Sequence, residues 1–232
     1  MTSHPTDVEL SSLPVGQIAA MLPGAAAVFL HHGVDFCCGG EQRLADAAAA
    51  RTLDLPSVLA ELAEVPAATN FAWYNADTAQ LIEHIKTRYH AVHLRELPWL
   101  IRLARKVEAA HKDNPEVPRG LTDLLMRIGA EVRIHQQREE IILFPMMLRG
   151  VAPMIASAIA TMRAEHDHHG VALAEIDRLT HDRMAPPDAC PTWKALCLGL
   201  TKFHDDLVLH VHLENNILFP RFGGAEPFEI GA

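Results

Sequence analysis

The chain has 232 residues, 49% of them hydrophobic, and a formal net charge of −9 at pH 7. This length and composition predict one domain of ordinary size together with a smaller one. The negative charge argues against a nucleic-acid-binding surface, because such a surface needs basic side chains to neutralise phosphates. The sequence has no run of about 18 apolar residues, so we expect no membrane span.

The first residues and the cysteines indicate the compartment. The segment Met1–Glu9 has neither the basic stretch nor the apolar stretch of a secretory signal. Cys37 and Cys38 are neighbours, and adjacent residues rarely form a structural disulfide because the small ring strains the peptide. Free thiols and the missing signal predict a cytoplasmic protein.

Composition divides the chain into two parts. Residues 1–66 are rich in Ala and Leu but are interrupted by Pro and Gly, which predicts a small domain of three or four short helices. The segment from Val65 to Asn70 is predicted to be a linker. Four long segments with helical periodicity follow, at about 77–112, 119–148, 153–182 and 190–219.

The four long segments predict the second domain, residues 77–222. Almost no segment alternates with period two, so the fold class is all-α. Long helices joined by short loops predict an antiparallel four-helix bundle. Pro98 is expected to kink the first long helix, and Gly150 is expected to end the second.

One motif occurs twice in the bundle. Residues 135–145 and 210–220 both read H-x3-E-x2-I-L-F-P. Residues four apart lie on one face of a helix, so each copy directs one imidazole and one carboxylate to the same place. Buried carboxylates are costly unless they are paired or bind a metal. A surface salt bridge, such as Glu139 with Arg133 or Arg138, does not account for the repetition.

The repeat extends towards the N-terminus. His90 precedes His135 by 45 residues, and His166 precedes His210 by 44. The predicted metal ligands share this twofold pattern and are His90, His135, Glu139, His166, His210 and Glu214. Such a set suits iron, manganese or zinc. The H-E-x-x-H motif of zinc hydrolases is absent, and two bridging carboxylates favour a pair of ions with an open position.

The remaining histidines and cysteines receive plainer interpretations. His93 and His169 lie three residues after His90 and His166, so they are expected to reach the site or to hydrogen-bond to its ligands. His111, His204 and His212 are placed away from the ligand face. Cys190 and Cys197 are seven apart and are expected to lie in the core.

These motifs together with Asp35–Gly40, Arg88–His90 and Glu165–Asp167 resemble the repair-of-iron-centres family, the YtfE, ScdA and DnrN group. The resemblance covers nearly the whole chain. It implies an N-terminal ScdA-type domain, a hemerythrin-like bundle and two non-haem irons with an oxo or hydroxo bridge, held by the same six residues. Oxygen-carrying hemerythrins have a different ligand pattern, with an Asp at the position that Asn215 occupies in this chain.

The resemblance implies repair of iron-sulfur clusters damaged by nitric oxide or oxidative stress, by a repair factor that donates iron rather than by a conventional enzyme. Damaged or apo iron-sulfur proteins are the expected partners. The alternative is a protein that binds, senses, scavenges or reduces NO or O2 at the two irons. Cys37 and Cys38 are then expected to assist transfer or redox chemistry, although two small side chains that merely fill an interface also fit.

Overall fold

The computed structural model describes residues 7–22, 24–65, 73, 75–150 and 152–222, and the predicted linker at 65–70 lies almost entirely outside this part. The described residues form helices and no sheet, with a single isolated bridge between Pro14 and Arg43. The predicted all-α class is therefore confirmed. None of the helices in the described ranges is both long enough and apolar enough to span a membrane.

The chain divides into two compact units, one of residues 1–81 and 208–232 and the other of residues 82–207. The first unit begins with five short helices, where the sequence predicted three or four. They are α1 (Asp7–Ser12), α2 (Val15–Met21), α3 (Ala25–His32), α4 (Leu44–Ala50) and α5 (Leu55–Glu64). Pro and Gly break the chain between them, and Gly33 ends α3 with φ of 64°.

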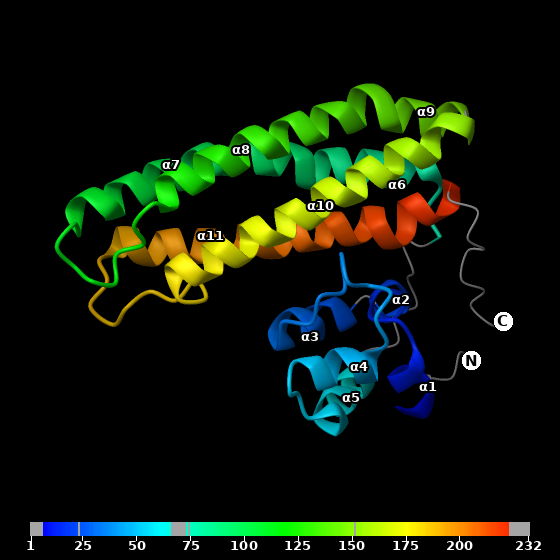
Figure 1. Ribbon diagram of the computed structural model, residues 1–232, viewed down its shortest axis with the longest axis horizontal. Coiled ribbons are helices and arrows are strands. Elements are labelled where there is room, and N and C mark those ends of the chain that lie inside the picture. Colours follow the sequence, from blue (N-terminus) through cyan, green and yellow to red (C-terminus); the bar gives the residue numbers. More distant parts are fainter. Residues whose placement is uncertain (1–6, 23, 66–72, 74, 151, 223–232) are drawn as a thin grey trace. The chain divides into compact units, whose positions relative to one another are not determined.

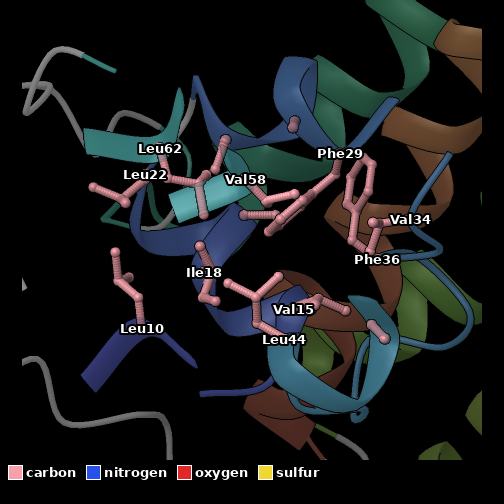
Figure 2. Packing of buried hydrophobic residues seen from close by; sticks show 14 of the residues in the cluster. Leu10, Val15, Ile18, Leu22, Phe29, Val34, Phe36, Leu44, Val58 and Leu62 are labelled. Carbon is pink, nitrogen blue, oxygen red and sulfur yellow. The ribbon is translucent and has the colours of Figure 1, made fainter. Parts of the chain in front are cut away.

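The five short helices enclose an apolar core. Phe29, Phe36, Val15 and Leu44 are fully shielded from solvent and point towards one another (Figure 2). Val208 and Leu209, near the C-terminal end of the last long helix, pack against the same core. The first unit is thus formed by two segments that lie far apart in the sequence.

Most of the long helical segments belong to the second unit, where they run side by side in Figure 1. The long segments are interrupted by π-helical and 3-10 turns (η). After α5, the elements of the whole chain in order are α6 (Thr78–His84), η1 (Ile85–His90), α7 (Ala91–Ala110), α8 (Leu121–Arg138), η2 (Glu139–Leu143), α9 (Phe144–Arg149), α10 (Ala152–Thr180), α11 (Pro191–His212), η3 (Leu213–Leu218) and η4 (Phe219–Phe222). The start of α6, the end of α11, η3 and η4 belong to the first unit. Gly150 ends α9 with φ of 69°, as predicted. Pro98 lies inside α7, which continues to Ala110.

The buried face of α8 shows how the bundle places polar groups inside. Leu125, Ile128 and Val132 are buried at helical spacing. His135 and Glu139 continue the same stripe and are equally buried. The candidate ligands therefore replace core residues on a face that the apolar pattern turns inward.

A charged network joins α7 and η1 to α11. Arg88 donates two hydrogen bonds to Asp206, at 3.0 and 2.7 Å, and Lys202 lies 2.8 Å from the same carboxylate and 2.7 Å from Glu96. Burial alone would raise the pKa of Asp206, but the hydrogen bonds from Arg88 and Lys202 hold this pKa below its ordinary value. Asp206 is therefore charged at neutral pH and links the helices.

We expect Asp206→Asn to lower the free energy of unfolding by about 2 kcal/mol at pH 7, because charged hydrogen bonds are lost around a buried group. Chemical denaturation measures this loss, and Asp205→Asn, at the more exposed neighbouring carboxylate, is the matched control. The pKa of Asp206 is lowered by folding, so its contribution is complete above the unfolded pKa of about 3.9. The difference between variant and native protein should therefore shrink as the pH falls through the folded pKa. A difference that does not change between pH 7 and pH 3 would contradict this assignment.

Candidate metal centre

Wide helical turns coincide with the candidate ligands. His90 is the last residue of η1, Glu139 is the first residue of η2, and Glu214 is the second residue of η3, and all three elements are π-helical. A π-turn is bonded from residue i to i+5, and such insertions in α-helices occur frequently at functional sites. The sequence pattern predicted plain α-helices here and gave no signal for these turns.

In the second unit, one buried carboxylate lies between two imidazoles. Glu139 has no exposed surface; its Oε2 is 3.5 Å from Nε2 of His90, and its Oε1 is 3.3 Å from Nε2 of His135. Nε2 of His166 lies 3.1 Å from Nε2 of His135. The structure thus brings together four of the six predicted residues, and each of them is buried.

The outer nitrogens of two of these rings determine where the inner lone pairs point. Nδ1 of His90 lies 2.8 Å from a carboxylate oxygen of Glu140, and Nδ1 of His135 lies 2.7 Å from one of Glu165. A carboxylate accepts, so each Nδ1 carries the hydrogen and donates. In the neutral tautomer, each Nε2 then directs its lone pair at Glu139. Histidine ligands of metals are typically supported by carboxylates in this way.

These contacts fit a cation at the centre. Imidazole lone pairs and carboxylate oxygens that face each other in a buried site repel unless positive charge lies between them. The separations of 3.1–3.5 Å between these pairs of atoms suit two ligands of the same ion, because bonds of about 2.1 Å at right angles place ligand atoms about 3 Å apart. Mixed imidazole and carboxylate donors favour first-row transition metals.

The second copy of the motif folds in the same way in the first unit. Nε2 of His210, in α11, is 3.2 Å from Oε1 of Glu214, and the side chains are 1% and 0% exposed. His135 and Glu139 are 3.3 Å apart by the same atoms. The repeated sequence therefore produces a repeated pair, as the spacing predicted.

Cys37 and Cys38 lie in the loop between α3 and α4. Their sulfur atoms are 3.7 Å apart, and the carboxylate of Asp35 accepts hydrogen bonds from both backbone N–H groups, at 3.2 and 2.9 Å. The hydrogen bond to Cys38, together with burial and the neighbouring Asp35, raises the pKa of the Cys37 thiol far above its ordinary value. Cys37 is therefore protonated at neutral pH and is not a free thiolate nucleophile.

The cysteine loop is fixed to the turn that carries Glu214. Asn215 donates to the backbone carbonyl of Cys37 at 3.1 Å, and Asn216 donates to that of Phe36 at 3.0 Å. The second asparagine fits so closely that a Cβ atom added at Gly16 or Gly40 would lie 2.6 Å from its Oδ1 atom. Asn215 stands at the position where the oxygen-carrying pattern has an Asp, and here it holds the cysteine loop.

The other histidines have several different environments. His93 is fully buried, beside Gln136 at 3.2 Å, and the ring of His169 lies 4.9 Å from that of His135. Burial lowers the pKa of His212 to about 4, and its ring packs against Phe36. His169 therefore lies beside one candidate ligand, whereas His93 contacts Gln136, the residue that follows His135.

Beside His135, the surface of the second unit has a cavity of about 330 Å³. It is lined by Glu131, Ile134, His135, Arg138, Glu165, His168 and His169. The lining has two carboxylates and three imidazoles, and Arg138 forms an ion pair with Glu165 there. The cavity therefore lies against a candidate ligand that is itself buried. Sequence reasoning did not assign a role to Glu140 or Glu165, although each is adjacent to a predicted ligand.

Comparison with known proteins bears on the whole arrangement. Residues 81–222 match the hemerythrin HHE cation binding domain, and residues 12–66 match ScdA_N, a domain of unknown function (DUF542). The chain is 44% identical over 211 residues to proteins named iron-sulfur cluster repair protein YtfE from Escherichia coli O157:H7 and Escherichia fergusonii, covering 90% of this chain and 95% of each relative. The likeness spans both predicted domains, and the buried His and Glu side chains fit the cation that the matched domain binds. The chain therefore belongs to the repair-of-iron-centres family of YtfE-type proteins, as its motifs predicted.

Proposed function

We propose that this protein restores iron-sulfur clusters damaged by nitric oxide or oxidants, using two non-haem iron ions that it holds and donates. The relatives named as iron-sulfur cluster repair proteins align with 90% of the chain. The observation that carries the proposal is Glu139, a fully buried carboxylate whose two oxygens face two different imidazoles. Such a group can bridge two ions.

The proposed ligands are the six residues that the duplicated pattern selects, His90, His135, Glu139, His166, His210 and Glu214. Two considerations support adding His210 and Glu214 to the residues around Glu139. The pair has the same internal geometry as His135 and Glu139, and the matched cation binding domain includes both copies. Each ion would then receive two imidazoles and two carboxylate oxygens.

The surrounding residues suit holding iron and letting it go. Glu140 and Glu165 keep the proton on the outer nitrogen of His90 and His135, so that the inner nitrogen is available as a ligand. A proton that reaches an inner nitrogen competes with the metal for it. The cavity beside His135 offers iron, as cargo, a route lined by two carboxylates and three imidazoles.

The cysteine pair suits reception of iron better than free nucleophilic attack. Cys37 keeps its proton at neutral pH, but a bound metal ion can displace a thiol proton. Asp35, Cys37 and Cys38 offer ligand atoms within 4.8 Å of one another. The loop also rests on the turn that carries Glu214. We propose that the two thiols take up iron on its way to a client, and their unbridged state supports a reducing, cytoplasmic location.

A second candidate function is binding or reduction of NO or O2 at the irons. It is favoured by the small number of donors, because four imidazoles and two bridging carboxylates leave positions open on ions that accept five or six ligands. The irons would supply the binding site for the diatomic molecule. The two functions differ in whether iron leaves the protein.

A direct test mixes iron-loaded protein with an NO-inactivated iron-sulfur hydratase and follows the return of hydratase activity. We expect recovery in step with loss of iron from the donor protein. Free ferrous iron at the same concentration and the iron-depleted protein are the controls. Consumption of NO without recovery of the hydratase would favour the second function and overturn iron donation.

We expect Glu139→Ala to abolish most iron binding, because the bridging carboxylate serves both ions. Elemental analysis of purified protein measures this. His204→Ala is the matched control, since that histidine pairs with Asp205 at 3.2 Å and lies outside the proposed set. Equal iron content in both variants would remove the basis of the ligand assignment.

Glu140→Gln should weaken iron binding by about 10–100-fold, because the ring of His90 loses its charged acceptor. The iron dissociation constant from a chelator competition gives the comparison. The control is Glu83→Gln, which changes an exposed carboxylate in α6 that pairs with Lys86. An unchanged constant in Glu140→Gln would show that His90 needs no such support.

The double variant Cys37→Ser, Cys38→Ser should keep its iron but repair the hydratase more slowly, because its hydroxyl groups are poor ligands for iron. Iron content, melting temperature and repair rate are measured on one preparation. A lower melting temperature with an unchanged repair rate per iron would show that the pair only fills space.

A further inference from the structure

A cysteine and a histidine meet at a place that the proposed repair chemistry does not use. His111 follows α7 and Cys190 precedes α11, and Nε2 of His111 lies 3.2 Å from the Cys190 sulfur. His111 is 21 residues beyond His90, which corresponds to about 31 Å along a helix. The pair thus lies in the second unit, remote from His90 along α7.

The start of α11 adds to the polarity around this sulfur. Cys190 is the residue before this 22-residue helix, and its carbonyl accepts the first turn's hydrogen bond from Lys194 at 3.1 Å. The backbone N–H groups of Thr192 and Trp193 point at the sulfur. Partial positive charge at a helix N-terminus favours a thiolate over a thiol.

The three cysteines with perturbed acidity differ in direction. The hydrogen bond from His111, followed by those of the helix N–H groups, lowers the pKa of Cys190. Burial raises the pKa of Cys197 to about 11, and the pKa of Cys37 is raised as well. The acidity therefore separates Cys190 from these two thiols.

Accessibility also separates Cys190 from Cys197. The sequence predicted that both cysteines lie on one helix and in the core. This is wrong for Cys190, which precedes α11 and is only half-buried. Cys197 is 4% exposed. The ring of His111 is held against the buried indole of Trp193, with centroids 5.0 Å apart, so the base is fixed beside a reachable sulfur.

We propose that Cys190 is a nucleophilic thiol that forms mixed disulfides with low-molecular-weight disulfides such as glutathione disulfide, with His111 as its base. A nucleophile within hydrogen-bond reach of an oriented base is the arrangement that activates thiols. The proton of Cys190 passes to His111, and the thiolate attacks one sulfur of the disulfide. The bond between Cys190 and that sulfur forms as the disulfide bond breaks, and the departing thiolate takes the proton from His111. This modification is independent of iron and goes beyond the proposed repair function.

The test uses the aromatic disulfide 5,5′-dithiobis(2-nitrobenzoate) on the full chain, with release of the coloured thiolate followed over time and the modified peptide identified by mass spectrometry. We expect Cys190 to react first and Cys190→Ser to remove the fast phase. Cys197→Ser, the buried cysteine of the same helix region, is the matched control and should leave this phase unchanged. Glutathione disulfide should then modify the same peptide.

His111→Gln should slow the fast phase at pH 7, because the loss of the hydrogen bond from His111 raises the pKa of Cys190 and leaves less thiolate. At pH 10, where thiols ionise without help, the rates of variant and native protein should converge. This convergence at pH 10 would show that His111 acts by activating the thiol. A change in folding or in access to the sulfur would instead slow the variant at both pH 7 and pH 10. A fast phase that survives Cys190→Ser, or that is unaffected by His111→Gln, would overturn the proposal.

Discussion

Repulsion between electron-rich atoms in a dry interior is the constraint around which the second unit is organised. Glu139 has no contact with solvent, and imidazole nitrogens approach it from two sides. Without positive charge between them, these groups would oppose the packing of the helices that bring them together. The outer carboxylates prevent relief by simple tautomerisation, because they hold the hydrogen on the far side of each ring. Folding and metal binding are thereby linked.

The π-helical turns serve this constraint. Each widened turn lies where an apolar stripe gives way to ligand residues, in η1, η2 and η3. A widened turn departs from ideal helical hydrogen bonding, so its persistence at three such places indicates that something else stabilises it. Ligation of a cation is a sufficient reason. Within the second unit, the Arg88 and Asp206 pair joins η1 to α11.

Much of this arrangement could be predicted from the sequence, for reasons that are physical. Helical periodicity fixes which face of a segment is buried, so His135 and Glu139 could be placed together on the inner stripe of α8 and η2. The π-turns could not be predicted, because they depend on tertiary contacts rather than on local propensity. The supporting roles of Glu140 and Glu165 were missed because their partners, His90 and His135, lie 50 and 30 residues away. Cys190 was misplaced because Pro191 begins the helix one residue later than the periodicity implied.

The contact of Asn215 and Asn216 with the cysteine loop has a consequence for dissecting the molecule. Val208 and Leu209 pack on the core of the short N-terminal helices, and the two asparagine amides donate to backbone carbonyls of the same region. A shortened chain that begins after residue 66 would expose these apolar side chains and leave the amides to water. The N-terminal residues are therefore a structural cover for the last turns of α11, and an isolated helical bundle would need a redesigned, more polar surface at this end to resist aggregation.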